Sequence, residues 1–135
     1  MSQGRAESVW EYPRPPRVEP TAEHVTVELA GVVIAESRRA LRVLETSHPP
    51  VYYLPPEDVA AGVLTAEPRR SFCEFKGVAV YWSAQAGDRN VAGAAWSYPE
   101  PAPGYEDLAG YVAFYPERVD ACFVNGERVT AQAGD

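Results

Sequence analysis

The sequence is poor in the side chains that build metal centres and disulfide frameworks. Its 135 residues include two cysteines, Cys73 and Cys122, and two histidines, His24 and His48. None of them shows the C-x-x-C or H-x-x-x-H spacing of a metal site, so we expect no metal and no other cofactor. We expect both thiols to be free, because a cytosolic chain keeps its cysteines reduced.

Positive charge and long apolar runs are also scarce. Twelve Lys and Arg stand against nineteen Asp and Glu, a net charge of -7, which argues against nucleic acid or an anionic membrane as partner. The longest apolar-rich stretch, Val25 to Ala35, is about half of the roughly 20 residues that a spanning helix needs. Residues 1–20 lack the continuous apolar core of a secretory signal. These features predict a cytoplasmic protein without a transmembrane segment.

Proline and glycine are plentiful and divide the chain into short pieces. There are 13 prolines and 10 glycines, which leave little room for long helices. The length favours one folded domain. We expect a proline-rich N-terminal arm over 1–20, pinned by Trp10 and Tyr12, then a single β domain over 21–131 and a tail over 132–135.

Most of the short pieces are predicted to be strands. Apolar residues alternate with polar ones at a period of two, and glycine or Asn-Gly turns separate several of the segments. One helix is predicted over Glu57 to Leu64, where prolines and acidic residues suit a first turn. The fold expected is mainly β, an antiparallel, strongly bent or barrel-like sheet of about seven to ten short strands. The predicted strands are Val25 to Leu29, Val32 to Ser37, Leu41 to Glu45, Val51 to Leu54, Ser71 to Lys76, Val78 to Ser83, Ala94 to Tyr98, Tyr111 to Tyr115, Val119 to Val124 and Glu127 to Ala131.

Two charged residues are candidates for a site. Lys76 is the only lysine among the twelve basic residues, and lysine can act as a base or an imine-forming amine where arginine cannot. Glu45 is in phase with Leu41 and Val43, so it is predicted to point inward, where a carboxylate needs a partner. The alternative for each is a solvated surface charge. We predict that Lys76 and Glu45 share one partly buried polar cluster.

Aromatic side chains form the second notable group. The chain has three Trp, eight Tyr and four Phe, and the candidate ligand-binding residues are Tyr53, Trp82, Trp96 and Tyr98. Rings with a few convergent polar groups can line a pocket that stacks a planar small molecule. The same rings on an acidic surface can instead bind a proline-rich or basic peptide.

Several motifs follow one another in a recognisable order over roughly residues 20 to 130. They are Ala35-Glu36-Ser37, Leu41 to Glu45, Tyr52-Tyr53-Leu54-Pro55, Asp58-Val59, Cys73-Glu74-Phe75-Lys76-Gly77, Tyr81-Trp82, Ala95-Trp96-Ser97-Tyr98-Pro99 and Gly110 to Tyr115. Together they resemble DUF427, a family of small, mainly bacterial domains of unknown function, and the resemblance implies a compact β-rich fold more than any activity.

The family is sometimes labelled nucleotidyltransferase-like. That chemistry needs clustered carboxylates for magnesium, and the pairs available are Glu57 with Asp58 and Glu106 with Asp107.

The function that these observations favour is small-molecule binding in a pocket around Lys76 and Glu45, with catalysis left open. A protein-interaction or scaffold module without catalysis is the alternative, and nucleotidyl transfer is a third. We expect both histidines to be solvated rather than catalytic, since neither has an identifiable orienting partner. An exposed edge strand permits either a monomer or a homodimer.

Overall fold

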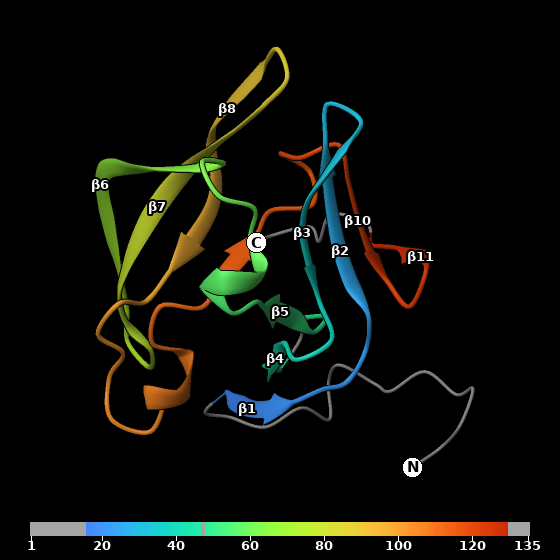
Figure 1. The fold of residues 1–135 in the computed structure, drawn as a ribbon. Helices are drawn as coiled ribbons and strands as arrows, with labels where there is room; N and C mark the ends of the chain where they lie inside the picture. The colour runs from blue at the N-terminus through green and yellow to red at the C-terminus, as the bar shows by residue number, and fades with distance from the viewer. Residues whose placement is uncertain (1–15, 47, 130–135) are drawn as a thin grey trace.

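Three antiparallel sheets build the molecule (Figure 1), as shown by a computed structural model that describes residues 16–46 and 48–129. The first sheet contains β1 (Arg17–Pro20), β4 (Leu41–Leu44) and β5 (Val51–Tyr53). The second contains, in spatial order, β11 (Glu127–Arg128), β10 (Ala121–Val124), β2 (Val25–Leu29) and β3 (Val32–Ser37). The third contains β6 (Leu64–Cys73), β7 (Gly77–Ala86), β8 (Arg89–Ser97) and β9 (Val112–Phe114). In Figure 1 the two four-stranded sheets lie on opposite sides, with β4 and β5 between them toward one end.

The mainly β, antiparallel class is confirmed, but the single barrel-like sheet is wrong. The described residues form eleven strands rather than seven to ten, and their three sheets do not close into a barrel. The reason is that the sheets meet through short bridges instead of continuous ladders. Leu54 and Val112 exchange two backbone hydrogen bonds of 2.8 Å, which join the first sheet to the third.

The helix predicted over Glu57 to Leu64 is also wrong. The structure has one 3-10 turn, η2 (Pro56–Asp58), and a second, η3 (Glu106–Leu108), later in the chain. Val59 is extended, and the Ala60 N–H donates to the Ile34 carbonyl at 2.8 Å, so these residues pair with β3. Gly62 then takes a φ of +81°. Pairing with a strand therefore replaces the i to i+4 bonds that a helix would need.

Part of the expected N-terminal arm is a strand. Arg17–Pro20 pairs with β4 along its full length, and proline is tolerated there because β1 is an edge strand. The rest of the arm, with Trp10 and Tyr12, and the tail over 132–135 lie outside the described residues. None of the helices in the described part of the chain is long and apolar enough to span a membrane.

Two groups of buried side chains form the interior. The larger cluster packs between the second and third sheets, and the smaller one packs among β4, β5, β9 and η3. Both consist mainly of valine, leucine, alanine and aromatic side chains from segments that are far apart in the sequence. The larger includes Val25, Val27, Leu29, Ile34, Leu54 and Phe114, and the smaller includes Val43, Tyr53, Tyr98, Tyr105 and Leu108.

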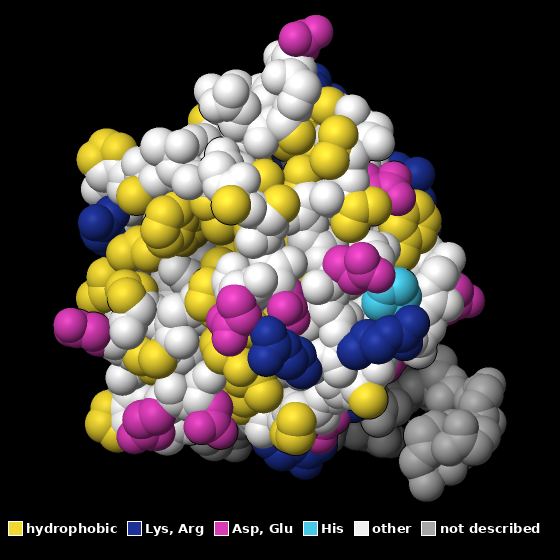
Figure 2. Space-filling view, viewed as in Figure 1, with side chains coloured by type: hydrophobic (Ala, Val, Ile, Leu, Met, Phe, Trp, Pro, Cys, Tyr) yellow, Lys and Arg dark blue, Asp and Glu magenta, His cyan; other side chains and the backbone are white. Residues whose placement is uncertain are grey.

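The surface is mixed in charge and carries a few exposed apolar side chains. Figure 2 shows acidic and basic groups interspersed on one face, with hydrophobic side chains reaching the surface over the β6 and β7 side. Phe72 is 74% exposed, and Phe75 and Val78 are also exposed at this hairpin. These three side chains form the apolar tip of the β6–β7 hairpin.

Asp120 connects two turns that are far apart in the sequence, which predicts an acid-sensitive contact. Its carboxylate accepts the Ala30 N–H at 2.7 Å and the Arg89 Nη1–H at 2.7 Å, and the Ala30 bond is the main cause that lowers the pKa of Asp120. Because that pKa is lower in the folded state, the contact stabilises the fold above about pH 4, the ordinary value, and is lost as pH falls through the folded pKa.

We therefore expect Asp120→Asn to unfold at a lower urea concentration than the wild type at pH 7. We also expect its urea midpoint to fall less than that of the wild type when the pH is lowered from 7 to 3. Urea titrations at the two pH values measure both effects. The control is Asp88→Asn, which removes an exposed carboxylate in the β7–β8 turn. If the urea midpoints of Asp120→Asn and the wild type fall equally between pH 7 and pH 3, the Asp120 contact is not acid-sensitive and the prediction is wrong.

Candidate functional site

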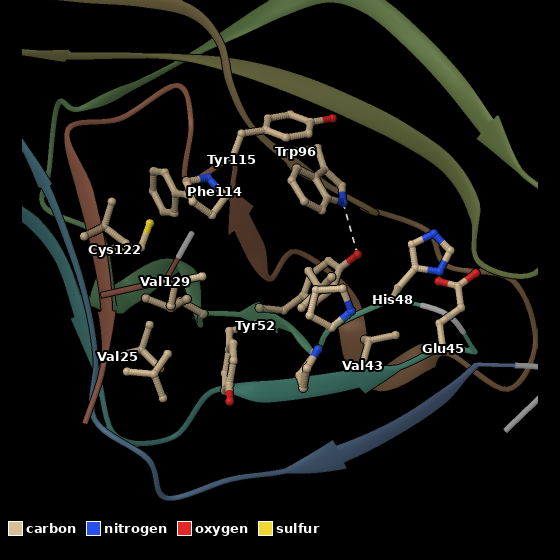
Figure 3. Close-up of a pocket in the computed structure, with 18 of the residues that line it drawn as sticks. Val25, Val43, Glu45, His48, Tyr52, Trp96, Phe114, Tyr115, Cys122 and Val129 are labelled. Atoms are coloured by element: carbon tan, nitrogen blue, oxygen red, sulfur yellow. Dashed lines mark hydrogen bonds between the residues drawn. The ribbon is translucent and has the colours of Figure 1, made fainter. Parts of the chain in front are cut away.

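A cavity of about 550 Å³ lies where the two clusters of buried side chains meet. That volume is within the range of small-molecule sites. Its walls come from all three sheets, so no single element forms it. Figure 3 shows aromatic rings in the middle, aliphatic side chains and Cys122 toward one end, and Glu45 and His48 toward the other. The lining residues include Val25, Val43, Glu45, His48, Tyr52, Tyr53, Lys76, Tyr81, Trp96, Tyr98, Phe114, Tyr115, Cys122, Val124, Arg128 and Val129.

Lys76 is held by the turn between β6 and β7. Its carbonyl accepts the Ala102 N–H at 2.9 Å, which ties the turn to a distant loop. Gly77 follows with a φ of +107°, and a Cβ there would lie 3.1 Å from the Ala102 nitrogen, so glycine is needed for this approach. The residue is 6% exposed and lines the cavity. The only lysine of the chain is thus a buried ammonium fixed by its backbone.

Glu45 follows the last residue of β4 and faces the same cavity. Its Oε1 lies 3.6 Å from the Lys76 Nζ, which is an ion pair but is longer than a hydrogen bond. The side chains differ in exposure, 8% for Lys76 and 37% for Glu45. The structure therefore brings the two candidates together, with one charge buried and the other half in solvent.

Three of the four candidate aromatic residues form the middle of the cavity. Tyr53 on β5 accepts the Trp96 Nε1–H at 3.0 Å, and the two rings meet edge to face. Tyr98 packs on the other side of Tyr53 with ring centroids 6.3 Å apart. Burial is the main cause that raises the pKa of Tyr53 and Tyr98 above the usual value, so both phenols stay protonated at neutral pH.

Trp82, the fourth candidate, lies outside the cavity lining. Its indole donates to Ser97 Oγ at 2.9 Å and packs against the larger cluster. The reason is strand alternation: Tyr81 pairs with Trp96 across β7 and β8, so Tyr81 shares the cavity face and its neighbour Trp82 takes the opposite face. The motif Tyr81-Trp82 thus supplies one lining residue, and it is the tyrosine.

Tyr115 extends the aromatic wall and was not selected from the sequence. Its ring stacks on Trp96 at 4.4 Å between centroids, and burial raises its pKa to about 12. On Tyr81 the Arg69 guanidinium stacks at 3.9 Å from the ring centroid. Tyr111 to Tyr115 was predicted as a strand, but only the register of β9 against β8 could place Tyr115 beside Trp96.

His48 lines the cavity, whereas the sequence favoured a solvated side chain. Its Nδ1–H donates to the Thr46 carbonyl at 2.9 Å, an arrangement that leaves Nε2 as the acceptor in the neutral ring. The position follows from a turn in which the His48 N–H donates to the Glu45 carbonyl at 3.1 Å. Pro49 and Pro50, which also line the cavity, follow directly.

The far end of the cavity is aliphatic. Val25 on β2 pairs with Val124 on β10, and Val129 and Cys122 complete this end. Burial raises the pKa of the Cys122 thiol to about 12, so it is a weak nucleophile at neutral pH. Both Cys122 and Cys73 are free thiols. Arg128 is the charged residue at this end, and its Nη2–H donates to the Asp120 carbonyl at 2.8 Å.

The carboxylate pairs considered for magnesium lie on the two 3-10 turns, away from the cavity lining. Asp58 accepts two hydrogen bonds from Arg39, of 3.0 and 3.1 Å, and Glu57 lies 3.7 Å from the same guanidinium. Glu106 accepts the Gly104 N–H at 3.0 Å. Within the described ranges, no group of three or more His, Cys, Asp or Glu side chains is arranged to hold a metal ion.

The fold and the cavity define a small, mainly β domain with an aromatic-walled pocket that contains one buried ammonium. The chain belongs to the family described as Domain of unknown function (DUF427), whose model matches residues 17–125. The resemblance found in the motifs is therefore confirmed. No curated protein matches the sequence.

Proposed function

We propose that this protein is a small-molecule-binding domain and that the cavity is its binding site. The single observation that supports this is the composition of the walls: aromatic and aliphatic side chains surround a space of about 550 Å³, with Glu45 and Lys76 together at one end and Arg128 at the other. Cavities of this kind bury most of a ligand and orient it with a few polar contacts.

A stronger form of the proposal makes the site catalytic, with Lys76 and Glu45 as the candidate residues. The second candidate function is a protein-interaction module, which the apolar tip of the β6–β7 hairpin favours. The proposal also includes the cytoplasm as the compartment, as the sequence suggested.

The test is a thermal-shift screen of neutral, acidic and basic compounds that contain one or two rings. It uses the wild type and two variants. Val124→Phe fills the aliphatic end of the cavity, and Val32→Phe adds the same atoms at an exposed position on β3. A ligand at about a hundred times its Kd stabilises a fold by roughly 2.7 kcal/mol. We expect compounds that raise the Tm of the wild type and of Val32→Phe by several degrees but leave Val124→Phe unchanged.

The opposite result is equally definite. If compounds stabilise the wild type and Val124→Phe equally, they bind elsewhere and the cavity is not the site. If no compound stabilises the wild type, the proposal fails and the interaction module becomes the better explanation.

A further inference from the structure

We infer that the natural ligand of this cavity is an organic acid with an apolar body, whose carboxylate binds the ammonium of Lys76. This inference rests on the proposed function and adds the chemical class of the ligand. It also gives Glu45 a role, because the ligand carboxylate takes the position beside Lys76 that Glu45 holds in the free protein.

The first argument is the incomplete coordination of Lys76. An ammonium group has three N–H donors. Among the described residues, Nζ makes no hydrogen bond, and its ion-pair partner Glu45 stays at 3.6 Å. Lys76 lines the cavity, so its ammonium can meet an acceptor that enters there. An acceptor in the cavity would complete its coordination.

The second argument is the difference in exposure between the two charges. Lys76 is held by its turn with 8% of its side chain exposed, while Glu45 is 37% exposed and follows the end of β4. A carboxylate in that position is hydrated as soon as it leaves the ion pair, as exposed charges are. A buried ammonium is not. Glu45 is therefore the partner that gives way when a second carboxylate enters.

The third argument is the character of the remaining walls. The phenols of Tyr53, Tyr98 and Tyr115 stay neutral because burial raises their pKa. They can donate hydrogen bonds to an acid but cannot neutralise a cationic ligand, which would also meet Lys76. Between the charged end and the valines lie the rings of Trp96 and Phe114 (Figure 3), which suit a flat apolar body. An acid with a ring or short chain matches both ends.

The test uses three probes with one body and different charges: 2-naphthoate, 2-naphthamide and 2-naphthylmethylammonium. Each is titrated into the full chain while the Trp96 indole N–H is followed by NMR, because this group lies in the cavity wall and bonds to Tyr53. Charge-assisted hydrogen bonds are worth roughly ten- to a hundredfold in affinity. We expect 2-naphthoate to bind at least about tenfold more tightly than the amide and the amine.

Two variants separate the roles of the charges. Lys76→Met is expected to remove the preference for 2-naphthoate while the amide still binds. Glu45→Gln is expected to raise the affinity for 2-naphthoate about five- to a hundredfold, because the ligand no longer has to displace a carboxylate from the ammonium. Arg38→Met and Asp88→Asn remove exposed charges outside the cavity and should leave all three affinities unchanged.

The outcomes distinguish this inference from the proposed function. Equal binding of acid and amide, or a preference for acid that survives in Lys76→Met, overturns the acid assignment and leaves the cavity as a binding site. Weaker binding of 2-naphthoate to Glu45→Gln overturns the exchange of carboxylates. If none of the probes moves the Trp96 signal at millimolar concentration, both the inference and the proposed function are contradicted.

Discussion

Replacing Tyr53 by alanine is expected to lower the free energy of unfolding by about 3 to 5 kcal/mol, the cost of removing a large buried ring. Tyr53 is 2% exposed, and its ring contacts Trp96 and Tyr98. Tyr53 both belongs to the smaller cluster of buried side chains and lines the cavity. Urea unfolding of the variant measures the loss.

Two further variants test whether the loss of stability in Tyr53→Ala comes from the burial of the ring. Tyr53→Phe keeps the ring but removes the oxygen that accepts the Trp96 Nε1–H, and we expect a loss of about 1 to 2 kcal/mol. Phe72→Ala removes a ring that is 74% exposed and should change stability by less than about 0.5 kcal/mol. A Tyr53→Ala loss no larger than that of Phe72→Ala would show that the described core is wrong.

Glu45→Gln is expected to destabilise the ligand-free protein more than Lys76→Met, although the two residues form one ion pair. Without the carboxylate, the buried Lys76 ammonium loses its charged partner, at a cost of about 1 to 3 kcal/mol. Without the ammonium, Glu45 turns to water, so we expect Lys76→Met to cost less than about 1 kcal/mol. Urea unfolding of both variants measures the difference.

The double variant tests the coupling. Glu45→Gln combined with Lys76→Met should be about as stable as Lys76→Met alone, because the unpaired ammonium is gone and coupled neighbours give non-additive losses. Losses that simply add, or a larger loss for Lys76→Met than for Glu45→Gln, would mean that the ammonium does not depend on this carboxylate. The same asymmetry underlies our proposal that an acidic ligand displaces Glu45 from Lys76.

Local patterns in the sequence predicted some strands and missed others, namely β1 and most of β6. Val25–Leu29 was predicted with its observed bounds because its apolar and polar residues alternate at a period of two, and Val32–Ser37 because Gly31 permits a turn before it. The pairing of these strands into three sheets depends on contacts between distant segments, such as the bridge from Leu54 to Val112. No local pattern contains that information, so the barrel-like sheet was wrong.

The candidate site was predicted in part for the same reason. Lys76 and Glu45 were selected by local signals, the scarcity of lysine and the phase of Glu45 within its strand, and the structure places them 3.6 Å apart. The sequence does not distinguish Trp82, which was predicted, from Tyr81, which lines the cavity, because the face of β7 toward the cavity depends on its register with β8. The sequence did not indicate His48 as a lining residue, because its hydrogen-bond partner is a backbone carbonyl and no pattern of side chains predicts such a contact.

A crystal structure of the protein with 2-naphthoate tests the central claim most directly, namely that the cavity binds a small molecule through its charged end. We expect the naphthalene ring in the cavity against Trp96 and a carboxylate oxygen within hydrogen-bond distance of the Lys76 Nζ, with Glu45 turned toward solvent. A probe bound at the apolar tip of the β6–β7 hairpin, with the cavity vacant, would contradict the account.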